Sequence, residues 1–511
     1  MTEAGPATWN ILLPDEAATA RLAEDIATAL LPGDIVALTG NLGAGKSVLA
    51  RAAIRALAGQ RDLTVPSPTF ALRIEYPIDR FAVTHVDLFR LTGAREIDEL
   101  GLQEALESGA LIIEWPDRLR HSLSAERLDV VLEEENGARS ATLTAHGTWP
   151  DRLARTRLIR AFLDGAHWRN ARRIPIVGDA SAKAFERVTQ NGRTAILMNA
   201  PKKSGSQQVE SPPPEESRSY DAVAHRAGTV GPFIAIDAEL RRRGVHAPEI
   251  FTTDIGAGLV LLEDLGSEGI VDTGGRAILP RYEAAIDLLI AIHGQDWPPV
   301  AHAEGDVSHA IPAYDHDALL IEISLFADWF VGKAGPDGKK GRPAWSASEC
   351  HEFLAAWRTV LQDLDAGPET WVLRDFHSPN IFWIAGKTGL DRLGVIDFQD
   401  TLRGHVAYDV ASLAQDARVD LSPDQEAALK ARYMAGRRAA DAAFDAAEFE
   451  AAYAVFGAQR ASKILGAFSR LASVGGKPGY LRHIDRAKEV LRRNLIHPVL
   501  SALRLWYAPY L

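Results

Sequence analysis

Residues 35–47 read IVALTGNLGAGKS, and this stretch decides the fold of the first part of the chain. Its end, GNLGAGKS (40–47), fits the phosphate-loop pattern G-x-x-x-x-G-K-[ST]. The apolar run before the glycines predicts a short buried strand, and SVLARAAIRALAG (47–59) predicts a helix that ends at Gly59. A strand, a glycine loop and a helix in this order predict a loop that binds phosphate at the start of the helix.

The loop residues have separate expected roles. The glycines let the backbone turn its N–H groups towards phosphate oxygens, and the dipole of the following helix favours the same anion. Lys46 adds a mobile positive charge, and the hydroxyl of Ser47 can ligate magnesium. The loop residues expected to bind nucleotide are Gly40, Gly43, Ala44, Gly45, Lys46 and Ser47.

A phosphate loop needs an acid that holds or orients the metal and the water, and two acids follow apolar runs. Asp87 lies in THVDLFR (84–90), and Glu114 lies in LIIEWP (111–116). Both are expected at the carboxyl ends of strands, beside the loop of an open α/β sheet. For either acid alone, the alternative is a strand-end carboxylate that faces water.

Four segments in this order resemble the TsaE family: GNLGAGKS (40–47), VPSPTF (65–70), HVDLFRL (85–91) and IIEWP (112–116). That family is the small bacterial ATPase of the tRNA threonylcarbamoyladenosine pathway, and the resemblance covers roughly residues 10–150. It implies ATP and Mg²⁺ as cofactors. It also implies TsaD/TsaB-like subunits of the threonylcarbamoyl-transfer complex as partners, which this domain would drive or reset without touching the modified base.

The same resemblance implies roles for individual residues. Ser47 and Glu114 would be linked to the metal, Asp87 would be a catalytic or metal-orienting acid, and Thr69 would lie in a switch-like loop near the γ-phosphate. Asn41 and Ser47 stand where the family commonly has Asp and Thr. Because serine keeps the metal-binding hydroxyl, nucleotide binding is still expected.

From about residue 171 the pattern of the chain changes. Residues 174–201 alternate short apolar runs with turns, which predicts an antiparallel meander, and the Ser-, Pro- and Glu-rich stretch at about 202–220 predicts a mobile loop. From about residue 280 the apolar spacing is helical. The expected parts are an ATPase domain at 1–150, a linker helix at 151–171, a β-rich lobe at 172–265 and a helical lobe at 266–511.

The helical part carries a second chemical pattern. VLRDFHSPNIFWI (372–384) places Asp375 and Asn380 five residues apart, as in the D-x-x-x-x-N loop of kinases, and Asp397 follows an apolar run in GVIDFQD (394–400). Asp375 would accept the proton of an attacking hydroxyl, while Asn380 and Asp397 would hold magnesium. The alternative is a capped turn followed by an unrelated strand-end acid.

Two departures exclude a eukaryotic-type protein kinase. Leu373 replaces the His of H-R-D, and Gln399 replaces the Gly of D-F-G. The strand GLVLLEDLG (258–266) lies between the β-rich and helical parts, so Glu263 and Leu265 are expected to offer backbone groups to adenine.

Residues 172–500 resemble the aminoglycoside-phosphotransferase-like kinases, and within them the AmgK-like anomeric amino-sugar kinases of peptidoglycan recycling. The segments that carry the closer match are GDASAKAFERV, AILMNAP, LLEDLG, AYDHDALLIEISLFADWF, LRDFHSPN, IDFQD, AYDVASLAQDAR and QRASKILGAFSRLA. The resemblance implies transfer of the ATP γ-phosphate to the C1 hydroxyl of N-acetylmuramate or N-acetylglucosamine. The expected fold is an α/β P-loop NTPase domain followed by a protein-kinase-like, two-lobed α+β domain.

The resemblance also offers a sugar-binding wall at 314–330, with Asp315, Glu322 and Trp329 as its candidate residues. For Glu322 the alternative is a solvated helix face. Asp409, in AYDVAS, is expected to support the catalytic loop rather than to react.

One kinase feature is missing from the sequence. Met198 stands where the third strand of kinases carries the Lys that holds the α- and β-phosphates. The charge could instead come from Lys183, Arg187, Lys202 or Lys203, and the sequence does not choose among them.

Composition limits the remaining options. The net charge of −12 argues against broad nucleic-acid binding, and the single cysteine, Cys350, excludes an internal disulfide framework and a cysteine zinc cluster. The start of the sequence has no secretory pattern, and no apolar run reaches the roughly 20 residues of a membrane span, so the cytoplasm is expected.

Two alternatives to this two-enzyme interpretation stay open. The first part could be a nucleotide-controlled regulatory module for the kinase. The acceptor of the kinase could also be an aminoglycoside, choline or another small alcohol.

Overall fold

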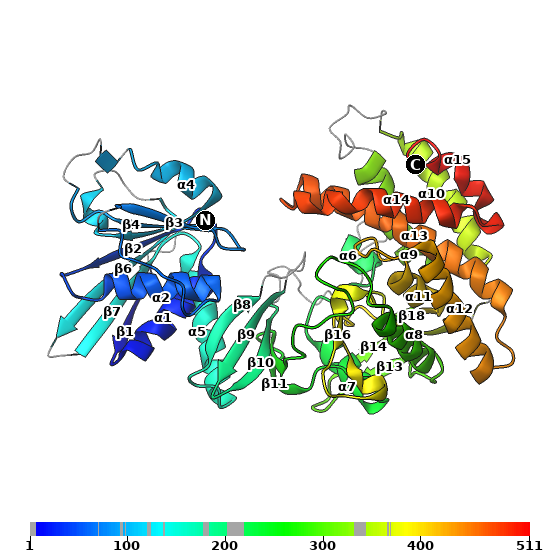
Figure 1. The fold of residues 1–511 in the computed structure, drawn as a ribbon, viewed down its shortest axis with the longest axis horizontal. Helices are drawn as coiled ribbons and strands as arrows, with labels where there is room; N and C mark the ends of the chain where they lie inside the picture. The colour runs from blue at the N-terminus through cyan, green and yellow to red at the C-terminus, as the bar shows by residue number, and fades with distance from the viewer. Residues whose placement is uncertain are drawn as a thin grey trace. The chain divides into compact units, whose positions relative to one another are not determined.

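The computed structural model divides into two compact units (Figure 1). The first unit comprises Met1–Pro201 and Phe251–Asp264, and the second comprises Lys202–Ile250 and Leu265–Leu511. The residues that the structure describes are 7–69, 71–91, 96–97, 99–119, 124–135, 138–176, 183–201, 219–331, 344–364, 367 and 369–511.

The first unit begins with a seven-stranded sheet in the order β1-β7-β6-β2-β5-β4-β3. Strand β2 pairs in parallel with β5 and β6, and β4 pairs in parallel with β5. The apolar runs in these central strands are buried, as parallel strands covered on both faces require. This confirms the predicted α/β domain. The strands are β1 (Ala7–Leu13), β2 (Ile35–Gly40), β3 (Arg73–Tyr76), β4 (Ala82–Asp87), β5 (Gly109–Glu114), β6 (Arg127–Glu135) and β7 (Ala138–Ala145).

Helices cover both faces of this sheet, with α1 and α2 on one side and α4 on the other (Figure 1). The side chain of Asp15 caps α1 (Glu16–Ala29) by accepting a hydrogen bond from Ala18 N at 2.7 Å. Helix α2 (Lys46–Ala58) starts at the phosphate loop and ends at Gly59, whose φ of 65° is left-handed, as the sequence predicted. Helix α4 (Leu102–Ser108) is short.

A second, five-stranded sheet completes the first unit, in the order β11-β12-β10-β9-β8, and its strands β12, β10, β9 and β8 pair antiparallel with one another in that order. The pairing of β8, β9 and β10 confirms the predicted meander. Its strands are β8 (Arg172–Ile176), β9 (Ala184–Gln190), β10 (Arg193–Asn199), β11 (Ile250–Asp254) and β12 (Leu259–Glu263).

Helix α5 (Trp149–Gly165) lies in the region expected to be a linker, but it is packed. Its Ile159 and Leu163 share one hydrophobic core with Val188 and Leu197 of the five-stranded sheet. The structure therefore groups this sheet with the ATPase domain, a division that differs from the predicted boundaries. The loop predicted at about 202–220 falls largely outside the described residues.

The second unit is mainly helical, as the spacing predicted (Figure 1). Helix α13 runs through its core, and Gly466 allows close packing there, because a Cβ at this position would lie 2.2 Å from the Leu325 backbone. Its helices are α6 (Tyr220–Val223), α7 (Gly231–Arg242), α8 (Leu279–His293), α9 (His316–Leu325), α10 (Ala347–Gln362), α11 (Ala407–Ala414), α12 (Pro423–Ala440), α13 (Ala446–Ser473), α14 (Ile484–Leu495) and α15 (Arg504–Tyr507), with a π-helical segment η3 (Phe326–Val331) after α9.

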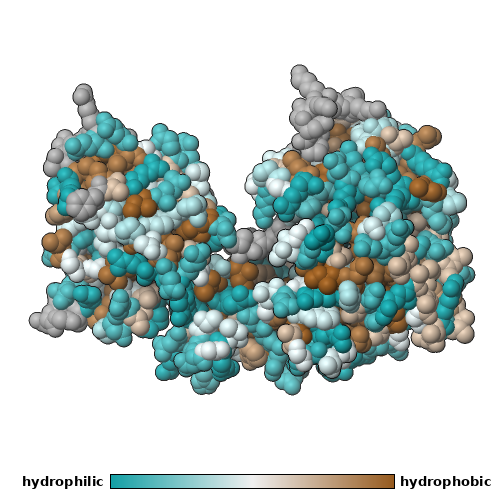
Figure 2. All heavy atoms as spheres, viewed as in Figure 1, coloured by the Kyte–Doolittle hydropathy of each residue, from teal (hydrophilic) through white to brown (hydrophobic). Residues whose placement is uncertain are grey.

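Three two-stranded sheets complete the second unit, and they pair β13 with β14, β15 with β18 and β16 with β17. Hydrophilic side chains cover much of the visible surface of each unit (Figure 2). Among the described residues, no helix combines the length and apolar character needed to cross a membrane. The strands are β13 (Val300–His302), β14 (Ser308–Ala310), β15 (Glu369–Val372), β16 (Ile381–Trp383), β17 (Leu393–Val395) and β18 (Leu402–His405).

Candidate active sites

The strand register brings the two predicted acids of the ATPase domain together. Asp87 on β4 is directly opposite Glu114 on β5, and Glu114 is opposite Leu38 on β2. Because parallel strands present their carboxyl ends at one edge, both acids meet the loop that follows β2. The pairing that the sequence predicted from two strand-end acids is therefore present in the structure.

The glycines of the loop are required by its backbone. Gly43 and Gly45 have φ values of 85° and 104°, and a Cβ on either would project into open space where a ligand could lie. A Cβ on Gly40 would lie 2.4 Å from the carbonyl oxygen of Leu132. Lys46 Nζ donates hydrogen bonds to the carbonyl oxygens of Gly40 at 2.7 Å and Asn41 at 2.9 Å, so the loop positions its own cation.

Glu114 connects the loop to a residue that the sequence interpretation missed. Ser47 Oγ donates to Glu114 Oε2 at 2.8 Å, and His85 Nε2 lies 2.9 Å from Glu114 Oε1. His85 and Glu114 are 1% and 2% exposed, so this contact is shielded from solvent. Strand alternation could have revealed His85 in the sequence, because it lies two residues before Asp87 and so faces the same side of β4.

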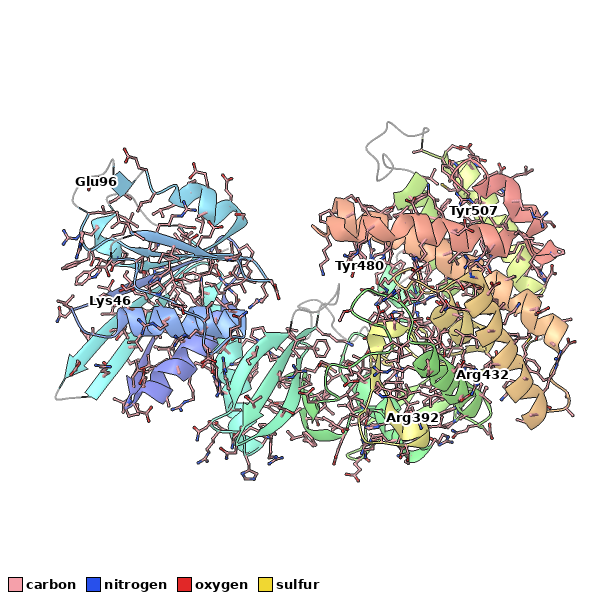
Figure 3. All side chains as sticks on the ribbon, in the orientation of Figure 1. Lys46, Glu96, Arg392, Arg432, Tyr480 and Tyr507 are labelled. Carbon is pink, nitrogen blue, oxygen red and sulfur yellow. The ribbon has the colours of Figure 1, made fainter. Side chains whose placement is uncertain are left out.

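A cavity of about 310 Å³ opens beside the loop. Lys46 lies at the start of α2 (Figure 3), and its Nζ is 3.9 Å from the ring centroid of Trp115. Thr69 Oγ1 donates to Ser67 Oγ at 3.1 Å on the cavity wall. The lining residues are Leu42, Gly43, Gly45, Lys46, Ser47, Val48, Ser67, Thr69, Asp87, Phe89, Arg90, Glu114 and Trp115.

Burial shapes the charges of this cavity. It lowers the pKa of Lys46, an effect that the nearby carboxylates of Glu114 and Asp87 oppose. It raises the pKa of Asp87, although the Phe89 N–H donates to Asp87 Oδ1 at 3.0 Å. Asp87 is therefore a more basic carboxylate than an exposed aspartate, which suits a group that orients water or accepts its proton.

The donor set fits magnesium and a nucleotide phosphate. A hydroxyl from Ser47 and carboxylates from Glu114 and Asp87 are hard oxygen ligands, and Mg²⁺ typically takes one or two protein ligands plus phosphate and water. Within the described part of the chain, no group of three or more His, Cys, Asp or Glu forms a cage that could hold a metal by itself.

The three predicted kinase residues also lie together, all in the second unit. Asn380 Nδ2 donates to the carbonyl oxygen of Asp375 at 2.9 Å and lies 3.4 Å from Asp397 Oδ2. This orientation leaves the Asn380 amide oxygen as the atom that suits a cation. Gln399, which replaces the glycine of the kinase motif, donates from Nε2 to Asp397 Oδ1 at 2.8 Å and holds that carboxylate in place.

Asp409 supports the catalytic loop, as predicted. Its oxygens accept hydrogen bonds from the backbone N–H groups of Leu373 at 2.7 Å and Arg374 at 2.9 Å, and the side chain is fully buried. Arg374 has a left-handed φ of 67°, so these hydrogen bonds stabilise an unusual backbone shape directly before Asp375.

Cations surround Asp375. Burial raises the pKa of its carboxyl, but Lys463, His377 and Arg460 more than oppose this and hold the pKa well below its usual range. Arg460 Nη1 lies 4.0 Å from Asp375 Oδ1. Burial and the charge of Arg418 lower the pKa of His377 to about 3, so at neutral pH the lysine and arginine carry the effect.

Glu322 is not on a solvated helix face, and that alternative is wrong. The carboxylate is fully buried, and it accepts hydrogen bonds from Arg374, Tyr314 and Gln459 and pairs with Lys463 Nζ at 2.7 Å. With its oxygens occupied by protein donors, Glu322 holds cations near Asp375 and presents no free surface to a sugar. The apolar sequence around it gave no sign of these distant partners.

The other two candidate sugar contacts stay predictions. Asp315 caps α9 by accepting from Ala318 N at 2.8 Å and pairs with His225 at 3.1 Å, but its side chain is still 49% exposed. Trp329 lies half-buried in the π-helical segment η3.

A buried methionine occupies the position where the third strand of kinases carries a lysine, as the sequence predicted. Met198 is 3% exposed on β10, between β9 and β12. Arg187 pairs with Asp264 at 2.7 Å, and Lys183 also lies among the described residues. Lys202 and Lys203 lie outside the described residues.

The adenine contacts expected of Glu263 and Leu265 also stay predictions. Glu263 ends β12 in the first unit, and Leu265 begins a segment of the second unit.

Two family models match separate parts of the chain. Residues 13–141 match the threonylcarbamoyl adenosine biosynthesis protein TsaE, and residues 172–443 match the phosphotransferase enzyme family. A TsaE protein of Rickettsia felis is 38% identical over 26% of this chain and 79% of its own length.

The second part of the chain is similar to N-acetylmuramate/N-acetylglucosamine kinases. The protein from Caulobacter vibrioides is 33% identical over 68% of this chain and 95% of its own length. The protein from Pseudomonas aeruginosa is 30% identical over 61% of this chain and 80% of its own length. The chain therefore belongs to two families, as an ATP hydrolase of the TsaE family joined to an ATP-dependent phosphotransferase of the phosphotransferase enzyme family.

Proposed function

We propose that the phosphotransferase part transfers the γ-phosphate of ATP to the anomeric hydroxyl of N-acetylmuramate or N-acetylglucosamine. The observation that carries this proposal is that Asn380 lies next to both Asp375 and Asp397, in a chain similar to kinases named for these two sugars. The products would enter peptidoglycan recycling in the cytoplasm.

The protein residues divide the work of this transfer. ATP with Mg²⁺ supplies the phosphoryl group and neutralises its charge when bound, and Asn380 and Asp397 would hold the metal. Asp375 would accept a hydrogen bond from the C1 hydroxyl and take its proton. Because its pKa is held low, Asp375 stays ionised and serves first to orient the hydroxyl, which suits a loose phosphoryl-transfer transition state.

We propose that the TsaE domain hydrolyses ATP in support of threonylcarbamoylation of adenosine in tRNA, together with TsaD/TsaB-like subunits. Ser47 and Glu114 would hold Mg²⁺, Lys46 would neutralise phosphate charge, and Asp87 would orient the attacking water. His85 would fix the Glu114 carboxylate through Oε1 so that Oε2 faces Ser47.

A substrate panel on the full chain tests the kinase proposal. N-acetylmuramate, N-acetylglucosamine, an aminoglycoside and choline would each be incubated with ATP and Mg²⁺, with phosphorylated product measured by mass spectrometry. We expect product from the two amino sugars. Product from the aminoglycoside or choline alone would contradict the proposed acceptor while leaving the phosphotransferase family intact.

A binding experiment tests the TsaE proposal. The full chain would be mixed with purified TsaD and TsaB proteins in the presence of ATP and Mg²⁺, and complex formation would be measured by gel filtration. A complex is expected. A chain that binds ATP at Lys46 but forms no complex would instead favour a regulatory module for the kinase.

A further inference from the structure

A buried cluster of charges joins the ATPase domain to the five-stranded sheet. Arg173 of β8 is fully buried and donates two hydrogen bonds to Glu186 of β9, at 2.6 and 2.8 Å. Its third contact, Nη1 to Oδ1 at 2.8 Å, goes to Asp25 of α1. One arginine therefore spans two elements that the sequence assigns to different domains.

Helix α5 adds a second arginine to the same cluster. Arg160 donates from Nε to Asp25 Oδ1 at 2.8 Å and lies 3.2 Å from Glu24 Oε2. Asp25 Oδ1 thus accepts from Arg160 and Arg173 together. Salt bridges link three positive and three negative side chains in this cluster: Arg160, Arg172, Arg173, Glu24, Asp25 and Glu186.

Pairing of the charges matters because the centre of the cluster, Arg173 and Glu186, is shielded from water. A buried ion pair is tolerated when every charge is paired, and removal of one partner leaves an uncompensated charge. Arg173 shows this balance, since burial lowers the pKa of its guanidinium while Glu186 and Asp25 raise it to a value above the usual range. The geometry therefore specifies one docking arrangement rather than a loose contact.

Helix α2 connects the phosphate loop to the same sheet. Lys46 is its first residue, and Gly59 closes its other end. Its C-terminal end lies against β8, where a Cβ added to Gly59 would come within 3.4 Å of Cγ2 of Ile174. Helices α1 and α2 also pack against each other. A straight path of packed residues thus runs along a helix of about 20 Å from the nucleotide site to β8.

Apolar packing also contributes to the interface between the ATPase domain and the five-stranded sheet. Helix α5 (Trp149–Gly165) covers the sheet core of Val188 and Leu197, and Arg155 of α5 donates to Asn199 Oδ1 of β10 at 2.9 and 2.6 Å. The core of the sheet is therefore closed by a helix that precedes the phosphotransferase match at residue 172.

We infer that the ATPase domain and the five-stranded sheet unfold as one cooperative body, so that nucleotide bound at the phosphate loop stabilises the sheet of the phosphotransferase. The ATPase domain and the sheet meet at an interface within the chain, and the ion cluster is the part of this interface that specifies how they dock. A ligand that binds only the folded form stabilises everything that must open with its site.

Hydrogen exchange of the full chain tests this inference. Exchange would be followed by mass spectrometry without nucleotide and with Mg²⁺–ADP at about 100 times its Kd, where an opening that releases the nucleotide should slow by about 100-fold. We expect peptides from 40–58, 172–176 and 184–190 to slow together, while α12 (Pro423–Ala440) in the second unit keeps its rate. Slower exchange at 40–58 with unchanged exchange at 172–190 would overturn the inference.

Three variants sharpen this experiment. Lys46→Ala should remove the nucleotide effect from 40–58 and lower the protection at 172–176 and 184–190 to the level that Mg²⁺–ADP bound at the phosphotransferase site alone provides. Glu186→Gln leaves Arg173 incompletely paired, and we expect it to reduce nucleotide-dependent protection at 184–190 by about tenfold or more while protection at 40–58 persists. Glu75→Gln is the matched control, because Glu75 forms an exposed pair with Arg73 and should change neither region. Full sheet protection in Glu186→Gln would show that the cluster does not carry the coupling and would overturn its assigned role.

A failure of nucleotide binding has a separate signature. If Mg²⁺–ADP slows no peptide in the wild-type chain, including 40–58, then both the inference and the proposed ATPase site are contradicted. If 40–58 alone responds, the proposed ATPase site stands and only the cooperative body is lost.

Discussion

His85 Nε2 lies 2.9 Å from Glu114 Oε1, and the other oxygen of the same carboxylate accepts a hydrogen bond from Ser47. The buried histidine therefore fixes one end of a carboxylate whose other end faces the hydroxyl proposed to ligate magnesium. Residues that orient a metal-linked group in this way typically contribute 10- to 100-fold to activity or metal affinity, so we expect about that effect here.

His85→Asn tests this relationship. We expect the ATP hydrolysis rate to fall by about 10- to 100-fold and the Mg²⁺ concentration for half-maximal rate to rise, because Glu114 is no longer held at the same angle. Nucleotide binding, measured by calorimetry, should change much less. His146→Asn is the control, since His146 pairs with Asp129 on the sheet surface. An unchanged Mg²⁺ dependence in His85→Asn would contradict the positioning role.

Lys463→Met tests the charge environment of Asp375. The pKa of Asp375 lies below its usual range, so this carboxylate is ionised at neutral pH and loses its charge only as pH falls. Among the cations that lower the pKa of Asp375, Lys463 has the largest effect. Its removal should therefore raise that pKa and move the acid limb of the kcat/KM profile to higher pH, by about one unit or more.

The matched control for this change is Lys430→Met, which breaks a surface pair with Glu450. Its pH profile should overlay that of the wild type. A Lys463→Met profile with the same acid limb would mean that Asp375 does not titrate in that limb.

Asp409→Ala tests the support of the catalytic loop. The change leaves the buried N–H groups of Leu373 and Arg374 without their acceptor, at a cost of about 1–3 kcal/mol for each. We expect the second unit to unfold at a lower denaturant concentration, measured by hydrogen exchange of α11 as denaturant is added. We also expect reduced sugar phosphorylation. Asp287→Ala removes an exposed partner of Arg432 and should leave both readouts near wild type. Equal stability of the two variants would rule out the supporting role of Asp409.

Much of the ATPase site could be predicted, because its determinants are local in sequence. The spacing of Gly40, Gly45 and Lys46 predicted the loop, and apolar runs ending at Asp87 and Glu114 predicted two acids at one sheet edge. His85 was missed because a single histidine within a strand gains meaning only when the register places it diagonally across from Glu114.

The mistaken alternative for Glu322 has a different physical cause. Glu322 is flanked by apolar residues on both sides in α9, and its partners Arg374 and Lys463 are distant in sequence, so no local pattern revealed a buried ion network. The contact between Asp25 and Arg173 likewise joins elements far apart in the chain. Tertiary contacts of this kind decide which units pack together, and helix or strand periodicity does not encode them.

Product formation by two full-length variants tests the central claim, which is that the chain contains two separate ATP sites with different tasks. Lys46→Ala and Asp375→Asn would each be incubated with N-acetylmuramate, ATP and Mg²⁺, and anomeric sugar phosphate would be measured by ³¹P NMR. We expect Lys46→Ala to phosphorylate the sugar at a rate close to wild type, and Asp375→Asn to lose about 10²- to 10⁴-fold in rate while ATP still binds. Unchanged turnover in Asp375→Asn, or loss of sugar phosphorylation in Lys46→Ala, would contradict the account.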